Sequence, residues 1–443
     1  MIDEQSIPTE RELWAVADAP VNGVAGNGTK ESPLRCAGDF NAVEPFLGPS
    51  VRLHLGAGEY RTRGIELPKT FILYGAPGTT IKLRDNCVDA IGFSAVRLFT
   101  DGGDWSNVFA IDGVTLDGNW ENQPGIRTGN FKIEPVSVQA IVGKVSRCTF
   151  RNWGCASGEY PADNKLEAFP CSLTTFANGD REKYYPSYAN ISEPTTRLEI
   201  LDNNIEEGTF RDGGYCTAAF VRTSMGESAG DRQPAGTRTT EAALVRGNRI
   251  SVPGGIALGG AHLDAATFED NDVTGKCAFN LDTGGGWGVT IRNNRAFGVA
   301  QGPNLTPSSG SNIRIENNFL EMDEPFFNTV LGALEDAWGI RLTPGMDCIV
   351  ERNTVLASNA WPGQAFSGFS AQDSNRFVRF AGGAAGGSRE DLARWTALEA
   401  QLRGDLAKAA ARAASLESVI NRYRTARAIA ETARGTMFAE VGS

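Results

Sequence analysis

The phrase that decides the fold of this chain occurs six times in its second half: ILDNNI (200–205), VRGNRI (245–250), FEDNDV (268–273), IRNNRA (291–296), IENNFL (315–320) and VERNTV (350–355). Each copy reads apolar, any, any, Asn, any, apolar, and the aligned residues are Asn203, Asn248, Asn271, Asn294, Asn318 and Asn353. Their spacings are 45, 23, 23, 24 and 35 residues. A period near 23, doubled or lengthened in places by an insertion, indicates a solenoid.

The apolar residues of these copies lie in short strand-like runs and not at helical spacing, so each copy predicts one coil of a β-solenoid. Parallel strands of successive coils stack about 4.8 Å apart, which would place the asparagines in one column. Asn tolerates the left-handed conformation that a bend needs, and its amide both donates and accepts hydrogen bonds. The alternative is six unrelated turns in an antiparallel sandwich, but the near-constant spacing favours the solenoid.

The composition describes a soluble globular chain. Its 443 residues are 41% hydrophobic and 21% charged, and the formal net charge of −11 argues against a nucleic-acid partner. No apolar run approaches the ~18 residues that cross a membrane. The acidic, polar start (MIDEQSIPTERELW) lacks the basic flank and apolar core of a secretory signal. We therefore expect a virion-associated protein or one exported without a signal, and a signal that was removed is the alternative.

The eight cysteines form no C-x-x-C pair, which argues against a zinc site. Cys148 takes the place of the column asparagine in an earlier coil, and most of the others begin or join strand-like runs. We interpret most of them as small buried hydrophobic residues. Cys155 and Cys171 lie in one insertion and could form a local disulfide.

Residues 1–50 read as a leading segment that caps the solenoid. Thr9 and Glu12 form a capping box that predicts a helix through Leu13, and a second helix is expected from Asp39. From Val51 the sequence alternates apolar and polar residues, with a turn at 56–58 and further short strands at 64–83, 96–99, 109–116 and 136–142. The β-solenoid is predicted over residues 51–380.

The opening of this region resembles a known family. GNGTKESP (26–33), VRLHLGAGEYRTRGIELP (51–68) and FILYGAPGTTIKL (71–83), with the later IDGVTLDGN (111–119) and VTIRNNRA (289–296), are similar to right-handed parallel β-helix proteins of the pectate-lyase-like superfamily. That superfamily includes polysaccharide lyases, polygalacturonase-type hydrolases and phage tailspikes. The resemblance implies an all-β, right-handed, single-stranded parallel β-helix. The D-D and G-H-G signatures of the hydrolases and the calcium-dependent lyase motif are absent.

Three insertions and a tail interrupt the repeat. The insertions lie between Cys148 and Asn203, near 224–240 and at 322–345, and such loops are either tolerated insertions or part of a binding face. Residues 381–387 (AGGAAGG) predict a flexible linker. Residues 388–435 carry apolar residues at alternating spacings of three and four, which is typical of a coiled coil. We expect an oligomerising helix, with a trimer favoured; the alternative is a helix packed on the solenoid.

Candidate site residues come from the two coils that begin at Asn248 and Asn271. Asp264 and Trp287 both lie 16 residues after their column asparagine, so they are predicted to be neighbours on adjacent rungs, about 5 Å apart. An indole ring beside a carboxylate is a reasonable sugar subsite, because the ring stacks on C–H groups while the carboxylate accepts hydroxyl hydrogen bonds.

The same count places His262 beside Gly285 and Asp282 beside Gly259. Asp282, Asp264 and His262 are the candidate catalytic residues, and Trp287, Asp212 and Tyr215 are the candidate substrate-binding residues. Each could instead have a structural role, with the two aspartates capping turns and Trp287 shielding one.

The sequence therefore favours a protein that engages a polysaccharide or other glycan along one side of the solenoid, and a tailspike-like glycan depolymerase, hydrolase or lyase, is the hypothesised activity. A non-catalytic glycan-binding or adhesive protein and a structural spike or spacer are the alternatives. No metal site and no cofactor are predicted, although calcium is an alternative that the acidic loops leave open.

Overall fold

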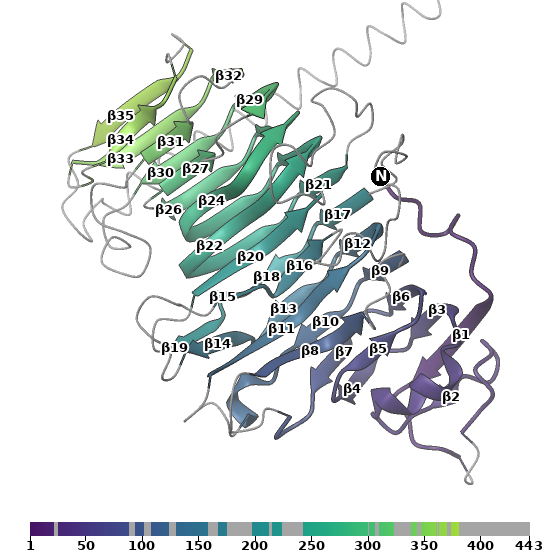
Figure 1. Cartoon of the computed structure of the whole chain (residues 1–443). Coiled ribbons are helices and arrows are strands. Elements are labelled where there is room, and N and C mark those ends of the chain that lie inside the picture. The colour runs from purple at the N-terminus through teal and green to yellow at the C-terminus, as the bar shows by residue number, and fades with distance from the viewer. Residues whose placement is uncertain are drawn as a thin grey trace, which may run out of the picture. The chain divides into compact units, whose positions relative to one another are not determined.

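The computed structural model is all-β, and long parallel sheets dominate it (Figure 1). It describes residues 1–21, 25–87, 94–101, 108–123, 130–157, 167–174, 197–211, 215–223, 242–299, 301–305, 310–322, 338–342, 347–359, 361, 363–369 and 374–380. The chain divides into two compact units, Met1–Phe380 and Ala381–Ser443. The linker and helix predicted over 381–435 lie outside the described residues.

Each coil passes through three stacks of strands, which we call faces 1, 2 and 3. Face 1 is a 12-stranded parallel sheet. Its strands, in spatial order, are β2 (Leu34–Arg35), β1 (Arg11–Val16), β3 (Ser50–Leu55), β6 (Thr70–Gly75), β9 (Val108–Asp112), β12 (Val142–Ser146), β17 (Arg197–Leu201), β21 (Ala243–Arg246), β23 (Ala266–Glu269), β25 (Thr290–Arg292), β29 (Ile313–Glu316) and β32 (Cys348–Glu351).

Face 2 follows the bend at the end of each face 1 strand. Its strands are β4 (Gly58–Thr62), β7 (Thr79–Leu83), β10 (Thr115–Asp117), β13 (Thr149–Arg151), β18 (Asn204–Ile205), the starts of β22 (Arg249–Asp264) and β24 (Asp272–Trp287), then β26 (Arg295–Val299), β30 (Phe319–Met322), β33 (Thr354–Ser358) and β35 (Arg376–Phe380).

Face 3 completes the coil. It contains β5 (Ile65–Leu67), β8 (Ser94–Asp101), β11 (Asn130–Gln139), β16 (Cys171–Thr174), β20 (Tyr215–Arg222), the ends of β22 and β24, β27 (Gln301–Leu305), β31 (Trp338–Leu342) and β34 (Gln364–Ser367). Four short strands border it: β14 (Gly154–Ser157), β15 (Glu167–Ala168), β19 (Thr209–Arg211) and β28 (Gly310–Ser311).

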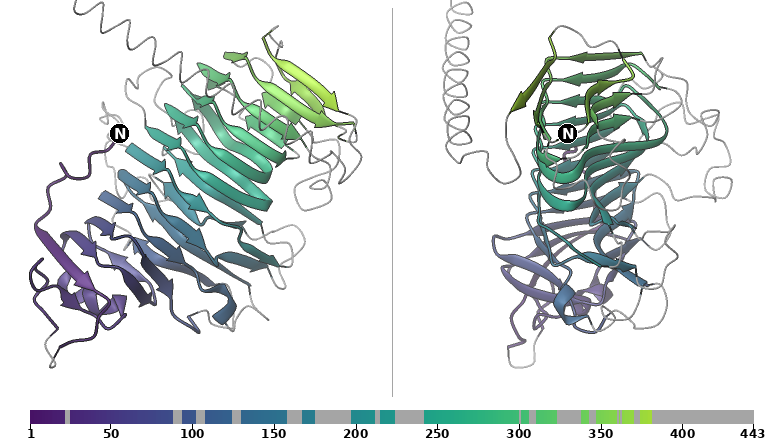
Figure 2. Two further views of the ribbon diagram at one scale, coloured as in Figure 1. Left: turned by 180° about the vertical axis from the view of Figure 1, so that it is seen from behind. Right: turned by 90° about the vertical axis from the view of Figure 1, so that its left-hand side faces the viewer.

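Strands of successive coils stack one above another (Figure 2), an arrangement consistent with the predicted β-solenoid. The strands expected from Val51 onward are confirmed, since β3 to β7 follow the predicted order and Val51, Leu53 and Leu55 are buried. Face 1 carries a continuous aliphatic and aromatic column into the core. Its members are Leu13, Leu53, Leu73, Ile111, Val145, Ile200, Val245, Phe268, Ile291, Ile315 and Val350.

The predicted asparagine column is confirmed and is hydrogen-bonded along its length. At its centre, Asn271 Nδ2 donates to Asn294 Oδ1 at 2.9 Å and to the carbonyl of Val245 at 2.9 Å. Asn294 Oδ1 also accepts the backbone N–H of Asn271 at 3.1 Å. The same pattern joins every neighbouring pair from Asn203 to Asn353. Each buried amide therefore ties one bend to the next.

Two details of the column differ from the prediction or extend it. The left-handed residue of each bend is the one before the asparagine and not the asparagine itself: Asp202, Gly247, Asp270, Asn293, Asn317 and Arg352 have φ between 56° and 69°. The column also has a seventh member, because Asn375 Oδ1 accepts from Asn353 Nδ2 at 3.0 Å. Cys148 takes the matching place at the other end, where its backbone N–H donates to Asn203 Oδ1 at 2.9 Å.

The expected helix after Thr9 is wrong, because residues 11–16 form strand β1, which pairs in parallel with β3 from Arg11–Val51 to Ala15–Leu55. Face 1 thus begins before Val51. The second expected helix is a 3-10 helix, η1 (Phe40–Phe46), whose N-cap Asp39 accepts from the backbone of Asn41. A second 3-10 helix, η2, spans Trp120–Asn122. Phe40, Val43 and Leu47 are buried in the core.

The cysteines behave as core residues. Six of the eight are buried, and all are free thiols, including Cys155 and Cys171, for which a disulfide was the alternative. Burial raises the pKa of Cys148 to about 12 and holds the pKa of the Cys171 thiol well above its ordinary value. These thiols are therefore neutral and buried, which makes them poor nucleophiles.

Candidate functional site

The predicted pairing of an acid with an aromatic residue is present in the backbone of face 3. Asp264, the last residue of β22, is paired with Trp287, the last residue of β24, and Trp287 is paired in turn with Ser311 of β28. Paired residues of neighbouring parallel strands lie about 4.8 Å apart. An acidic, an aromatic and a hydroxyl-bearing residue therefore occupy successive rungs at one position of face 3.

Asp282 does not lie where the residue count placed it. It is paired with Ala261 and not with Gly259, because β22 carries extra residues between Val252 and Ile256. A second irregularity follows, and here β24 carries the extra residues. Ala261 and Leu263 of β22 are paired with Asp282 and Gly286 of β24. The second irregularity cancels the first, so that Asp264 and Trp287 meet as predicted although the coils between them bulge. Bulges of this kind are common beside functional sites.

The other predicted residues fall around this position. His262 lies inside the second irregularity, between the paired residues Ala261 and Leu263, so no register partner fixes its place beside Gly285. Tyr215 begins β20 and is paired with Glu167 of β15. Asp212 lies outside the described residues. Face 3 thus brings Asp264 and Trp287 together, places Asp282 nearby on the same strand as Trp287, and puts Tyr215 one strand before β22.

Two columns that each include polar residues run beside this position across the same strands. Arg222 of β20 is paired with Ala261, which is paired with Asp282, so a small residue separates a cationic position from an acidic one. The neighbouring column contains Phe220, Gly259, Asn280, Asn304 and Arg341. The Arg341 guanidinium lies 3.7 Å from the centre of the Trp338 ring, which is close enough for a cation–π contact.

A polar cluster that sequence reasoning missed lies on the N-terminal part of face 3. Glu134 of β11 is completely buried, and its carboxylate accepts from Lys132 Nζ at 2.7 Å, Arg97 Nε at 3.3 Å and the backbone N–H of Phe169 at 3.1 Å. A buried carboxylate needs such partners, because an unpaired buried charge is very costly. Lys132 is close to Glu134 in sequence, but Arg97 and Phe169 lie 37 and 35 residues away, so no local motif could have predicted the whole cluster.

This cluster connects to the predicted site through β15. Lys132 Nζ lies 3.4 Å from the carbonyl of Glu167 and 5.6 Å from the centre of the Phe169 ring, while Thr217 Oγ1 donates to the Glu167 carboxylate. Glu167 is the residue paired with Tyr215. The cluster therefore fixes β15 against β20. Its charged groups are engaged with one another, and we interpret it as support for the face and not as a reaction centre.

Within the described ranges, no group of three or more His, Cys, Asp or Glu side chains is placed to hold a metal ion. In that same part of the chain, no helix has both the length and the apolar character needed to cross a membrane.

Comparison with protein-family models, with curated proteins and with solved structures found no match to this chain.

Proposed function

We propose that this protein binds a polysaccharide along face 3, across strands β20, β22, β24 and β31. The observation that carries the proposal is the pairing of Asp264 with Trp287 on adjacent rungs. Aromatic rings stack on the C–H faces of sugars, and carboxylates accept their hydroxyl hydrogen bonds. Repeating rungs suit a repeating polymer, because successive sugar units can meet equivalent positions on successive coils.

The polar columns beside this pair support the same proposal. They offer an amide at Asn280, cations at Arg222 and Arg341 and a second acid at Asp282. A neutral or weakly charged glycan suits such a mixture better than a nucleic acid does, since the chain has a net charge of −11. The finer fold that we propose with it is a right-handed parallel β-helix of the pectate-lyase-like, tailspike-like type.

Depolymerisation of the bound glycan is the second candidate function, and Asp282 is the observation that favours it. Asp264 and Asp282 lie on neighbouring strands of face 3 around the irregularity that contains His262. Glycosidic hydrolysis uses two carboxyl groups, one as acid and one as base or nucleophile. In this proposal Asp264, Asp282 and His262 are the catalytic residues, and Trp287, Asp212 and Tyr215 hold the substrate.

The binding test is a glycan array with the full chain, followed by titration of the best-bound polysaccharide. We expect Trp287→Ala to weaken binding at least tenfold, because truncation of a central aromatic contact commonly costs more than about 1.4 kcal/mol. Asp272→Asn is the matched control for Asp264→Asn, since Asp272 lies on face 2 of the same strand as Trp287. Unchanged affinity in both Trp287→Ala and Asp264→Asn, or an array without any retained glycan, would refute the proposal.

Mass spectrometry of the products separates the two candidate functions. New reducing ends indicate a hydrolase and unsaturated ends a lyase, and Asp264→Asn and Asp282→Asn should each abolish these products without lowering the melting temperature. Binding without any new product leaves the adhesive function, and the absence of binding leaves a structural spike.

The tail supplies the remaining part of the proposal. We propose that residues 388–435 form an oligomerising helix, most simply in a trimer, and that the assembly acts on a virion or outside the cell. Light scattering of the full chain and of a chain ended at Gly387 tests this. An equal monomeric mass for both would refute it.

A further inference from the structure

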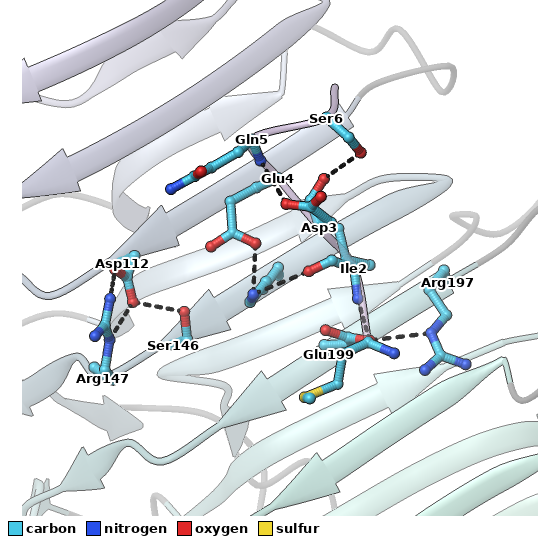
Figure 3. A network of polar contacts seen from close by, with 12 residues as sticks. Ile2, Asp3, Glu4, Gln5, Ser6, Asp112, Ser146, Arg147, Arg197 and Glu199 are labelled. Atoms are coloured by element: carbon cyan, nitrogen blue, oxygen red, sulfur yellow. Dashed lines mark hydrogen bonds and ion pairs between the residues drawn. The ribbon is translucent and has the colours of Figure 1, made fainter. Parts of the chain in front are cut away.

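A network of polar contacts lies on the outer side of face 1, where residues 2–6 cross the strands (Figure 3). Arg52, Ile72, Ala110, Lys144 and Glu199 form one register column through β3, β6, β9, β12 and β17. Four rung steps of about 4.8 Å make this column about 19 Å long. The segment follows the column with a turn at Asp3–Ser6, where the backbone N–H of Ser6 donates to the carbonyl of Asp3 at 3.1 Å.

The two ends of the column hold the backbone of this segment. At one end, Glu199 Oε1 accepts the backbone N–H of Ile2 at 2.7 Å, and Lys144 Nζ donates to the carbonyl of Ile2 at 3.1 Å. At the other end, Arg52 Nη2 donates to the carbonyls of Glu4, Gln5 and Ile7 at distances of 3.2, 3.2 and 2.9 Å. All of these contacts are made to main-chain atoms, so they would serve another peptide that makes the same turn.

One contact is made to a side chain of the segment. Lys144 Nζ lies 2.6 Å from Glu4 Oε2, and both side chains are largely buried, with exposed fractions of 12% and 15%. An ion pair that is shielded from water in this way is stronger than an exposed one. The surface therefore prefers an acidic side chain two residues after the amide that Glu199 binds.

The floor of the column is apolar. Ile72 and Ala110 alternate with the inward residues of β6 and β9, yet they are 0% and 3% exposed. Outer-face residues of a strand are buried only where something covers them, and residues 2–6 pass over this face (Figure 3). Tyr74 borders the floor in the next column, stacked 5.3 Å from His54, and burial together with the charge of Glu4 raises the pKa of its hydroxyl.

The polar groups of the column also need an occupant. Glu199 is completely buried, and its charge is met by Arg197 Nε at 3.1 Å and by the segment itself, including the nitrogen of Met1 at 3.6 Å. Its second oxygen, Oε2, has no hydrogen-bond partner among the described residues. No strand pairing with face 1 is present for residues 1–7, so a few side chains carry the attachment. Segments attached in this way open at a low free-energy cost.

We infer that this column is a peptide-docking groove for a short segment that makes one turn and carries an acidic fourth residue, and that residues 1–7 of the chain are its exchangeable occupant. The groove lies on face 1 and is separate from the glycan site proposed on face 3. Because its contacts need no sheet edge, the occupant can leave and return while the ladder of face 1 stays intact.

The test keeps the full chain and cuts it after folding. A protease recognition sequence is placed at the exposed Pro8–Glu10 connection, and the cut protein is challenged with a fluorescent peptide of residues 1–8. We expect saturable binding that the unlabelled peptide reverses, and no binding to the uncut chain, whose groove is filled. A Glu4→Gln peptide should bind at least tenfold more weakly, and this variant does not change the protein.

Variants of the protein provide a second test of the peptide groove. Lys144→Met should weaken peptide binding at least tenfold and should speed hydrogen exchange of residues 1–7 in the uncut chain, while the strands of face 1 stay protected. Lys30→Met, in an exposed loop, is the matched control. The inference is overturned if the cut protein does not bind the labelled peptide, if the Glu4→Gln peptide binds as well as the original, or if the uncut chain binds equally.

Discussion

The coils from Asn203 onward and the coils before Cys148 turn the backbone at the same place with different side chains. The later coils use a buried asparagine that bonds to the next coil, as Asn248 Nδ2 does to Asn271 Oδ1 at 2.9 Å. The earlier coils use backbone bonds at small residues instead, such as Gly56 N–H to the carbonyl of Ala15 and Ala76 N–H to that of Leu55, both at 2.9 Å.

The two regions differ in their cores as well. In the earlier coils, Phe71, Phe99 and Phe109 contact one another with ring centres 5.9 to 6.4 Å apart. The face 1 column that holds Phe71 and Phe109 continues through Gly143 and then, in the later coils, through Leu198, Ala243 and Ala266. In this column, the large rings of Phe71 and Phe109 thus lie in coils that lack the ladder. A solenoid coil can therefore be stabilised either by large buried side chains or by a buried column of polar side chains.

The largest expected effect comes from the aromatic core of the earlier coils. Phe71→Ala should lower the free energy of unfolding by about 4 kcal/mol, because it removes a fully buried ring and leaves a cavity. Chemical denaturation measures the loss, and Ala266→Gly, in the same column of a later coil, is the control with little volume to lose. Similar losses in the two variants would contradict the role of core volume.

The next largest effect comes from the asparagine column of the later coils. Asn271→Ala should cost about 3 kcal/mol, because the Val245 carbonyl and the Asn248 amide lose their buried partner. Asn375→Ala, at the half-buried end of the column, is the control and should cost about 1 kcal/mol. Equal shifts of the denaturation midpoint in the two variants would show that the ladder does not carry the stability of these coils.

A gain of stability would sharpen the comparison. Cys148→Asn extends the column by one coil, since the new amide could donate to Asn203 Oδ1 and, following the pattern of the ladder, to the carbonyl of Ile111. We expect an increase of about 1 kcal/mol, the usual net value of a hydrogen bond. Cys148→Ser, which is small and polar but too short to reach the next coil, should not produce it. A Cys148→Asn chain less stable than Cys148→Ser would argue against an extendable column.

The smallest effect concerns the charges outside the ladder. Arg292 pairs with Glu269 on the outer side of face 1, where its side chain is 49% exposed. Arg292→Ala should change the free energy of unfolding by about 0.5 kcal/mol, because exposed ion pairs contribute little. Thermal melting at low and high salt checks this. A change comparable with that of Asn271→Ala would mean that the outer charges, and not the asparagines, fix the register.

The asparagine column could be predicted because one residue type repeats at nearly constant spacing. Asn375 was not predicted as a member of the column, because the residue three positions before it is Gln372, which is not apolar. Strand β1 escaped because Thr9 and Glu12 give a strong local helix signal, whereas its true signal is the alternation of buried Leu13 and Ala15, which pairing with β3 stabilises. Pairing with β3 therefore decided between a local helix pattern and a local strand pattern.

The candidate site was predictable only in part for a related reason. The pairing of Asp264 with Trp287 followed from counting, but only because two irregularities in β22 and β24 cancel. Asp282 lies between them, so the count placed it two residues away from its true partner, Ala261. The Glu134 cluster and the peptide groove bring together residues that are far apart in the chain. No regular spacing in the sequence predicts either of them.

The most direct test of the account is a crystallographic electron-density map of the coils from Asn248 to Asn318. We expect Asn271 Nδ2 to lie within hydrogen-bonding distance of Asn294 Oδ1, near 2.9 Å, with the Val245 carbonyl as its second partner. A map in which these side chains point to solvent, or in which Asn271 and Asn294 lie on unrelated turns, would contradict it.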